Sequence, residues 1–328
     1  MTHRPWLSFH RKRKESSPNR LICSSIILLF ILCLDRTVYS QSSKHLLKTA
    51  SERHLSVEEQ TLPLVIQKLL IAYPDTLKTA TSLNAHRGIL HWRQNEESQW
   101  DIPRRQVDLD TWHTLNTKQR SEVWGNKPFE EVLNHPHFSD QFIQTYPKNR
   151  ALPSALPINF EPGRIRDESF FKKLYGAHAQ EVRTHLTTIR WGTQRLKVTR
   201  LYRINERLEA IYAELKKLPK SFRKFYEPSA GAYNWRTIKG TKRLSVHSFG
   251  AAIDIGVQFS NYWRWTLKVY GSSSKGLIPY KNRFPQEVIS IFERYGFIWG
   301  GWWYHHDTMH FEYRPELLID RLTHFNRE

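Results

Sequence analysis

The chain has 328 residues, of which 39% are hydrophobic and 13% aromatic, and its formal net charge at pH 7 is +19. This length and composition suffice for one sizeable hydrophobic core with a smaller accessory unit. Both cysteines, Cys23 and Cys33, lie in the first forty residues, which excludes a thiol nucleophile, a disulfide and a cysteine-type zinc site from the rest of the chain.

The positive charge extends well beyond the amino-terminal end. Residues 1–40 hold seven Lys or Arg and two Asp or Glu, a net of +5, so the remainder carries +14 of the total +19. A basic surface attracts polyanions, which include nucleic acid, anionic lipid and an anionic cell-wall polymer. A basic protein without any polyanionic partner is the alternative.

The first forty residues have the pattern of a signal peptide. Basic residues at 11–14 precede an apolar run at 21–34, which is short for a membrane span. We expect cleavage after the small residue Ser40, export to the periplasm or the extracellular space, and no stable membrane span afterwards. An uncleaved anchor is the alternative. A lipoprotein signal is less favoured because Leu32, which is not small, precedes Cys33.

Residues 41–60 are polar and predict a linker, and residues 61–160 are interpreted as an amino-terminal accessory region. Apolar spacing predicts a helix over 62–77, and residues 88–101 indicate a β-hairpin. Residues 110–145 mix short helical pieces. His135 and His137 lack a carboxylate partner at ligand spacing, which favours a surface loop over a metal site.

Residues 161–328 form the second predicted unit. Helices are expected over 170–175, 204–218 and 285–295, and a strand over 198–203. Residues 258–283 are an aromatic and polar insertion between the two stretches described next.

The first of these stretches places His247 and Asp254 seven residues apart, with Gly250 between them. After the glycine, Asp254 alternates with Ile253 and Ile255, which predicts a strand with an acid on one face. A buried strand rarely carries an inward carboxylate without a partner. A metal ion is one such partner, and His247 is a candidate second ligand.

The second stretch, at 296–313, also ends in strand-like alternation. His310 and Glu312 share one face of this predicted strand, and Asp307 lies at the turn before it. The two strands together offer His247, Asp254 and His310 as a ligand set.

Both stretches resemble the M15 family of zinc peptidases, which comprises D-alanyl-D-alanine carboxypeptidases and L-alanyl-D-glutamate endopeptidases of bacterial cell walls. The motifs that carry the resemblance are Ser245-x-His247-x-x-Gly250-x-Ala252-x-Asp254, Trp299-Gly-Gly-x-Trp303 and Asp307-x-Met309-His310-Phe311-Glu312. The resemblance is clear from about 161 to 318. It implies an α+β fold, in which a small antiparallel sheet carries a zinc site and is flanked by helices, with residues 161–328 as the catalytic domain.

The resemblance also implies roles for single residues. Zn²⁺ would be held by His247, Asp254 and His310, and three protein ligands leave one coordination position open, as catalytic zinc sites do. Asp307 holds the position of the family's acidic general base; a supporting contact to a ligand histidine is the alternative role.

Arg236 matches the family's arginine that anchors a substrate carboxylate, a task suited to the planar guanidinium. Ser245 is expected to form a hydrogen bond near the site. Glu312 is expected to contact the ligand His310 rather than the metal itself. His305 and His306 could compete as ligands, but we expect them behind the ligands or on the substrate side.

The sequence therefore predicts an exported zinc peptidase that cleaves a D-amino-acid-containing bond in peptidoglycan stem peptides. D,D-carboxypeptidase activity is slightly favoured over L-alanyl-D-glutamate endopeptidase activity. A non-catalytic, zinc-dependent wall-binding module is the alternative from another class. A nuclease is disfavoured because neither a phosphate-binding loop nor a ββα-metal pattern occurs, so no nucleic-acid partner is expected, and a His-Glu-x-x-His string is absent.

Overall fold

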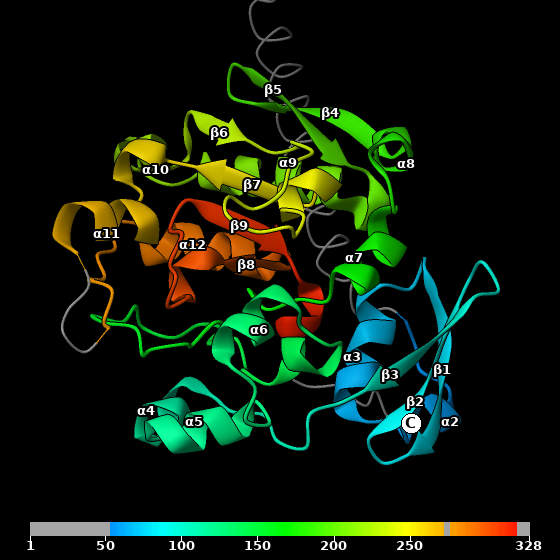
Figure 1. Ribbon diagram of the computed structural model, residues 1–328. Coiled ribbons are helices and arrows are strands. Elements are labelled where there is room, and N and C mark those ends of the chain that lie inside the picture. Colours follow the sequence, from blue (N-terminus) through cyan, green and yellow to red (C-terminus); the bar gives the residue numbers. More distant parts are fainter. Residues whose placement is uncertain (1–52, 272–275, 320–328) are drawn as a thin grey trace, which may run out of the picture. The chain divides into compact units, whose positions relative to one another are not determined.

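The computed structural model describes residues 53–271 and 276–319, which form an arrangement of helices and small antiparallel sheets (Figure 1). The predicted signal peptide and residues 41–52 of the predicted linker lie outside the described residues. Within the described residues, no helix has the length and apolar character needed to cross a membrane. The α+β class expected from the sequence is confirmed.

The amino-terminal region begins with two helices and a three-stranded antiparallel sheet of order β1-β2-β3. These elements are α2 (Val57–Gln60), α3 (Leu64–Ala72), β1 (Leu77–Asn84), β2 (Arg87–Trp92) and β3 (Glu97–Asp101). The helix predicted over 62–77 is shorter because Tyr73 leaves helical geometry at φ −129°. The chain then enters β1, which adds a third strand to the predicted hairpin.

Short helices follow, as the mixed pattern over 110–145 predicts. They are α4 (Leu109–Thr114), α5 (Thr117–Val123), α6 (Phe129–Asn134) and η1 (Ser139–Phe142). Asp108 and Asn116 cap α4 and α5 by accepting backbone N–H groups, as short polar side chains do at helix starts. His135 and His137 are both exposed, which agrees with the surface loop expected there.

The next elements build a hairpin and a long helix. They are α7 (Glu168–Tyr175), α8 (Ala179–Thr184), β4 (Leu186–Trp191), β5 (Gln194–Thr199), η2 (Leu201–Arg203) and α9 (Ile204–Leu215). The strand expected over 198–203 instead lies at 194–199. It ends early because Tyr202 and Arg203 adopt positive φ angles, 53° and 56°, that no strand tolerates.

A four-stranded antiparallel sheet, of order β6-β7-β9-β8, carries both motif stretches. Its strands are β6 (Ser229–Gly231), β7 (Ala252–Ile255), β8 (Phe297–Trp299) and β9 (His310–Tyr313). Asp254 pairs with His310 across β7 and β9, and Ile253 pairs with Phe311. Because side chains alternate along a strand, the two polar residues share one face and the two apolar residues the other.

Helix α12 (Gln286–Arg294) lies against the apolar face of this sheet (Figure 1), where Phe292 stacks on Phe311 with ring centroids 4.0 Å apart. The remaining elements are η3 (Lys220–Phe222), α10 (Arg223–Tyr226), η4 (Val246–Phe249), η5 (Val257–Phe259), α11 (Trp263–Tyr270), η6 (Gly300–Trp302) and η7 (Pro315–Leu317). His247 therefore lies on a short 3₁₀ turn just before β7.

One hydrophobic cluster includes residues from both predicted units. Tyr73 of α3 packs edge-to-face on Tyr202, with ring centroids 5.0 Å apart, and its hydroxyl donates to Glu316 at 2.6 Å. The region 61–160 thus contributes side chains to the same core that supports the four-stranded sheet.

Gly250 joins η4 to β7, and therefore His247 to Asp254. Its φ is +66°, and a Cβ atom there would lie 2.8 Å from the backbone nitrogen of Thr199. We predict that Gly250→Ala lowers the free energy of unfolding by more than the roughly 1–3 kcal/mol of positive-φ strain, since the clash with backbone adds to it.

Gly125→Ala is a matched control, because Gly125 has a φ of +65° but no atom lies within 4 Å of the position that a Cβ atom would take there. Urea denaturation of both variants measures the difference. Equal losses of stability would show that the close approach at Gly250 is unimportant.

Candidate metal centre and active site

Three ligand-type side chains converge on the polar face of the four-stranded sheet: His247, Asp254 and His310. The Nε2 atom of His247 lies 3.2 Å from Nδ1 of His310 and 3.1 Å from Oδ1 of Asp254. Nδ1 of His310 lies 3.0 Å from the same carboxylate oxygen. The three residues predicted from the sequence as ligands are thus brought together.

Hydrogen bonds behind each imidazole fix which nitrogen faces this centre. Nδ1 of His247 donates to the carbonyl oxygen of Ala232 at 2.5 Å, so Nε2 faces inward. Nε2 of His310 donates to Oε2 of Glu312 at 3.0 Å, so Nδ1 faces inward. Such outer contacts orient metal-binding histidines and fix their tautomer. Glu312 therefore occupies the supporting position expected for it.

The donor set fits zinc. Ligand atoms at 2.0–2.1 Å from a tetrahedral Zn²⁺ lie about 3.3 Å from one another, and the three separations here are 3.0–3.2 Å. Two imidazole nitrogens and one carboxylate oxygen are also donors that zinc accepts, with a fourth position left open.

The electrostatics of the three residues are tightly linked. Burial acts to raise the pKa of Asp254, but the neighbouring His247 and His310 outweigh it and hold that pKa well below its usual range. Burial acts to lower the pKa of His310, but hydrogen bonds to Asp254 and Glu312 raise it to about 10.

Asp307 lines the same cavity as the ligand set, at the turn before β9. Its Oδ1 atom is buried and has no hydrogen-bond partner among the described residues. Burial and the negative charge of Asp254 raise the pKa of Asp307 to about 7. A carboxyl group with a pKa near neutrality is suited to accept and return a proton, which is the behaviour of a general base.

The cavity at the centre has a volume of about 250 Å³. Arg236 and Ser245 both line it. Arg236 is exposed, while Ser245 is buried and its hydroxyl accepts the backbone N–H of His247, which caps η4. All the site residues predicted from the sequence therefore lie at one cavity, with Ser245 also holding the turn that carries a ligand.

Residues 239–313 match the family model described as D-alanyl-D-alanine carboxypeptidase, of the M15 peptidases. This segment is similar to the M15 peptidases. The match contains His247, Asp254, Asp307 and His310 but begins after Arg236. Neither the curated proteins nor the solved structures contain a match to the chain.

The M15 motif Trp-Gly-Gly-x-Trp holds the Asp307 turn in place. The carbonyl oxygen of Gly300 accepts the backbone N–H of Asp307 at 3.0 Å, and a Cβ atom at Gly300 would lie 2.7 Å from the Asp307 carbonyl oxygen. Trp303 packs on His310, with ring centroids 5.5 Å apart. Trp302, the additional aromatic residue in the motif, is buried against Trp299.

Several cavity residues escaped the sequence-based prediction. Arg164 and Arg166 come from the segment just before α7, and Tyr262, Trp263 and Trp265 come from the insertion. Backbone contacts join the insertion to the Asp307 turn. Tyr262 and Asp307 form an isolated antiparallel β-bridge, and the Trp263 N–H donates to the His306 carbonyl oxygen at 2.9 Å. The only sequence signal for these residues was the aromatic content of 258–283.

The two histidines next to Asp307 have different positions. His305 lines the cavity, as expected for a residue on the substrate side, and neither histidine belongs to the ligand cluster found among the described residues. His306 is fully buried, with Nε2 3.4 Å from the Thr266 hydroxyl. Burial lowers the pKa of His306 to about 4, so it packs as a neutral residue.

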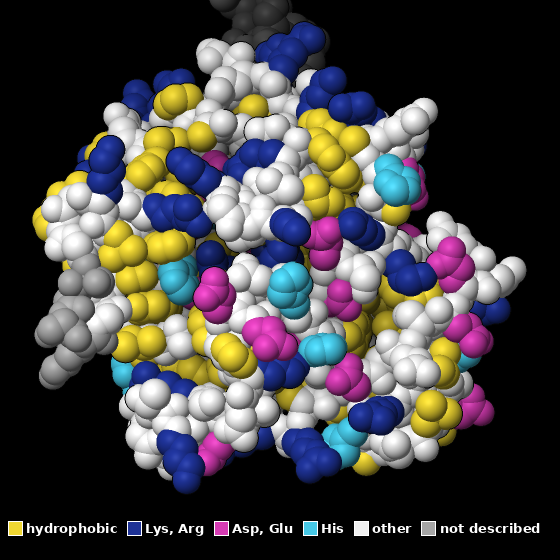
Figure 2. Space-filling view, viewed as in Figure 1, with side chains coloured by type: hydrophobic (Ala, Val, Ile, Leu, Met, Phe, Trp, Pro, Cys, Tyr) yellow, Lys and Arg dark blue, Asp and Glu magenta, His cyan; other side chains and the backbone are white. Residues whose placement is uncertain are grey.

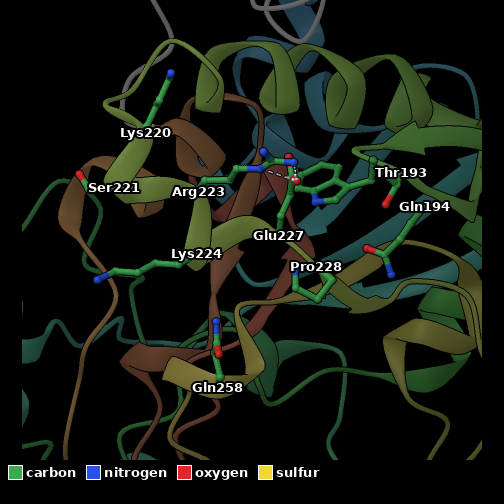
Figure 3. Close-up of a pocket in the computed structure, with 10 residues that line it drawn as sticks. Thr193, Gln194, Lys220, Ser221, Arg223, Lys224, Glu227, Pro228 and Gln258 are labelled. Atoms are coloured by element: carbon green, nitrogen blue, oxygen red, sulfur yellow. Dashed lines mark hydrogen bonds and ion pairs between the residues drawn. The ribbon is translucent and has the colours of Figure 1, made fainter.

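A second cavity, of about 590 Å³, lies beside η3 and α10. Figure 3 shows that its basic side chains do not converge: Arg223 is paired with Glu227, at 2.8 Å, while Lys220 and Lys224 extend in different directions. Its lining lacks the grouped acids and imidazoles of the candidate metal centre.

We predict that Glu312→Gln weakens zinc binding by about 10–100-fold, the usual scale for removing a charged partner behind a ligand histidine. The variant keeps a hydrogen-bond acceptor for His310 but removes the charge that raises its basicity. Competition titration with a chromogenic zinc chelator measures the affinity. Glu130→Gln, at an exposed position of α6, is the control; similar affinities in both variants would contradict the supporting role of Glu312.

Proposed function

We propose that the protein is an exported zinc peptidase that hydrolyses a D-amino-acid-containing peptide bond in peptidoglycan stem peptides, acting as a D,D-carboxypeptidase. The observation that carries this proposal is the convergence of His247, Asp254 and His310 beside Asp307 in one cavity, in a segment similar to the M15 peptidases. The description of the matching family supports a bond next to D-alanine.

In this proposal His247, Asp254 and His310 would hold Zn²⁺, which when bound would supply a Lewis acid for the scissile carbonyl and for water. Asp307 accepts the proton of the attacking water and delivers it to the leaving amine. Its buried, unpartnered Oδ1 supports this role, because that oxygen has no competing hydrogen bond among the described residues. A pKa near 7 suits both halves of the transfer.

Arg236 is the proposed anchor for the terminal carboxylate of the substrate. It lines the cavity from the segment before η4, and its side chain is exposed, with one long contact of 3.5 Å from Nη1 to the Thr237 carbonyl oxygen. Such a guanidinium can bind a carboxylate through two N–H groups. A free terminal carboxylate is the feature that distinguishes a carboxypeptidase substrate.

Export follows in this proposal from the signal-peptide pattern of residues 1–40. The basic body would then keep the enzyme near an anionic wall polymer. Figure 2 shows Lys and Arg side chains scattered over the displayed face among acidic ones, so the attraction would come from many separate charges rather than one continuous patch.

The reaction is tested on purified muropeptides. We predict that the zinc-loaded protein removes one terminal alanine, detected by mass spectrometry, and that a chelator abolishes the activity until zinc is restored. A stem peptide released at its L-alanyl-D-glutamate bond would instead identify an endopeptidase. Unchanged muropeptides would favour a binding module, and full activity without metal would contradict the mechanism.

Three substitutions separate the proposed roles. Asp307→Ala should keep one zinc per chain but lose about a hundredfold or more in turnover, the scale of a lost general base. His310→Ala should lose zinc affinity because it removes a ligand. Arg236→Ala should keep zinc and chiefly raise KM. Zinc loss in Asp307→Ala together with zinc retention in His310→Ala would reverse the two assignments.

A further inference from the structure

Glu161 is a buried carboxylate at the edge of the M15 cavity that the proposed reaction does not use. Its side chain has no exposed surface. The ring Nδ1 and the backbone N–H of His305 both donate to its Oε1, the backbone contact at 3.2 Å. Nη1 of Arg164 lies 3.7 Å from Oε2. Glu161 therefore holds two cationic or donor side chains in fixed positions.

Both of these side chains line the cavity that holds Asp307 and His310, whereas Glu161 does not. Nη1 of Arg164 is buried and makes no hydrogen bond within the described residues, its distance to Glu161 being too long for one. Because Nδ1 of His305 is bound to Glu161, its Nε2 is the ring nitrogen left for the cavity. Nη1 of Arg164 and Nε2 of His305 are thus two nitrogen atoms at the wall of the cavity that can form hydrogen bonds with a ligand.

The side chains of Arg164 and His305 are largely buried, 15% and 17% exposed, and aromatic packing surrounds His305. The ring of Trp263 meets His305 edge-on, with centroids 4.5 Å apart, and the guanidinium of Arg264 lies over Trp263 at 4.9 Å. Arg264 also donates to the carbonyl oxygen of Lys239, at 2.7 Å, which ties the insertion to the segment before η4. A charge-assisted hydrogen bond is stronger in such a partly dry environment than in bulk water.

We propose that Arg164 and His305 form a second carboxylate subsite, which selects substrates that carry a free side-chain carboxylate close to the scissile bond. The inference rests on the proposed function, in which Arg236 already binds the terminal carboxylate. The guanidinium of Arg164 donates to a carboxylate through its N–H groups, and His305, whose Nδ1–H is held by Glu161, adds a donor from Nε2 when the ring is protonated. The substrate class is therefore a peptide with a diacid residue before the D-alanine pair, rather than one with a neutral or amidated residue.

The position of Arg164 relative to Asp307 supports a role of this subsite in the proposed reaction. The charge of Arg164 acts to lower the pKa of Asp307 and the pKa of Tyr262. The guanidinium therefore lies within electrostatic range of the proposed base. A substrate carboxylate bound to Arg164 would fix the peptide at a second point beside the metal centre. Two-point binding positions a reacting bond more strictly than one anchor does.

The test uses two N-acetylated tripeptides that end in D-Ala-D-Ala and begin with glutamate or glutamine. For the zinc-loaded protein we expect kcat/KM for the glutamate peptide to exceed that for the glutamine peptide by about tenfold, the scale of one charge-assisted hydrogen bond. Arg164→Gln should bring the ratio close to one by slowing only the glutamate peptide. The exposed Arg195→Gln on β5 is the charge-matched control and should keep the ratio.

Calorimetric binding of both peptides to the zinc-loaded Asp307→Ala protein gives a readout that does not need turnover. If neither peptide is cleaved by the parent protein but the glutamate peptide binds more tightly through Arg164, the subsite stands and the proposed reaction fails. Cleavage of both peptides at equal rates with equal binding overturns the subsite and leaves the reaction.

A second variant keeps the test decisive if Arg164→Gln does not fold, since that change leaves Glu161 with one partner fewer. His305→Asn retains the Arg164–Glu161 pair and should reduce the preference for the glutamate peptide several-fold. A preference that persists undiminished in every folded variant would show that Arg164 and His305 only brace the Asp307 turn.

Discussion

The metal centre depends on a row of alternating buried charges that runs along β9 and beyond it. His310 donates to Glu312; Arg314 lies 3.6 Å from Glu312 and donates to Glu316 at 2.5 Å; and Glu316 accepts the hydroxyl of Tyr73. Each buried charge has an opposite charge or a donor beside it, which is the condition for burying charges at all. Loss of a member would leave its neighbours desolvated with one partner fewer.

This row links the geometry of a metal ligand to the hydrophobic core. Arg314 is fully buried and also donates to the carbonyl oxygen of Gly163 at 2.7 Å, just before the segment that supplies Arg166 to the cavity. Tyr73 reaches the row from α3, in the amino-terminal region. The region 61–160 therefore acts on the site through packing and hydrogen bonds, although it supplies none of the ligand cluster found among the described residues.

The sequence was sufficient to predict site residues that lie within one strand or one turn, because their spacing repeats with that element. Asp254 and His310 were found from period-two alternation, and the structure pairs them across β7 and β9. Local patterns could not reveal Glu161, because it lies 144 residues from its partner His305. Arg164, three residues after Glu161, carries no periodic signal either. The predicted position of strand β5 was wrong for a related reason, since Tyr202 and Arg203 adopt positive φ angles without the glycine or asparagine that would signal them in the sequence.

Different parts of the chain supply the reacting groups of the cavity and the side chains that would select a substrate. The ligands and Asp307 lie on or beside strands whose register is fixed by backbone pairing. The opposite wall comes from the insertion, whose contacts with the rest of the cavity include the Tyr262 β-bridge, the Trp263 N–H and the Arg264 side chain. Substitutions in α11 can therefore change which side chains face a substrate without moving the ligand strands. For this reason, differences in substrate preference are expected to arise from the insertion and from the Arg164 segment rather than from the metal motif.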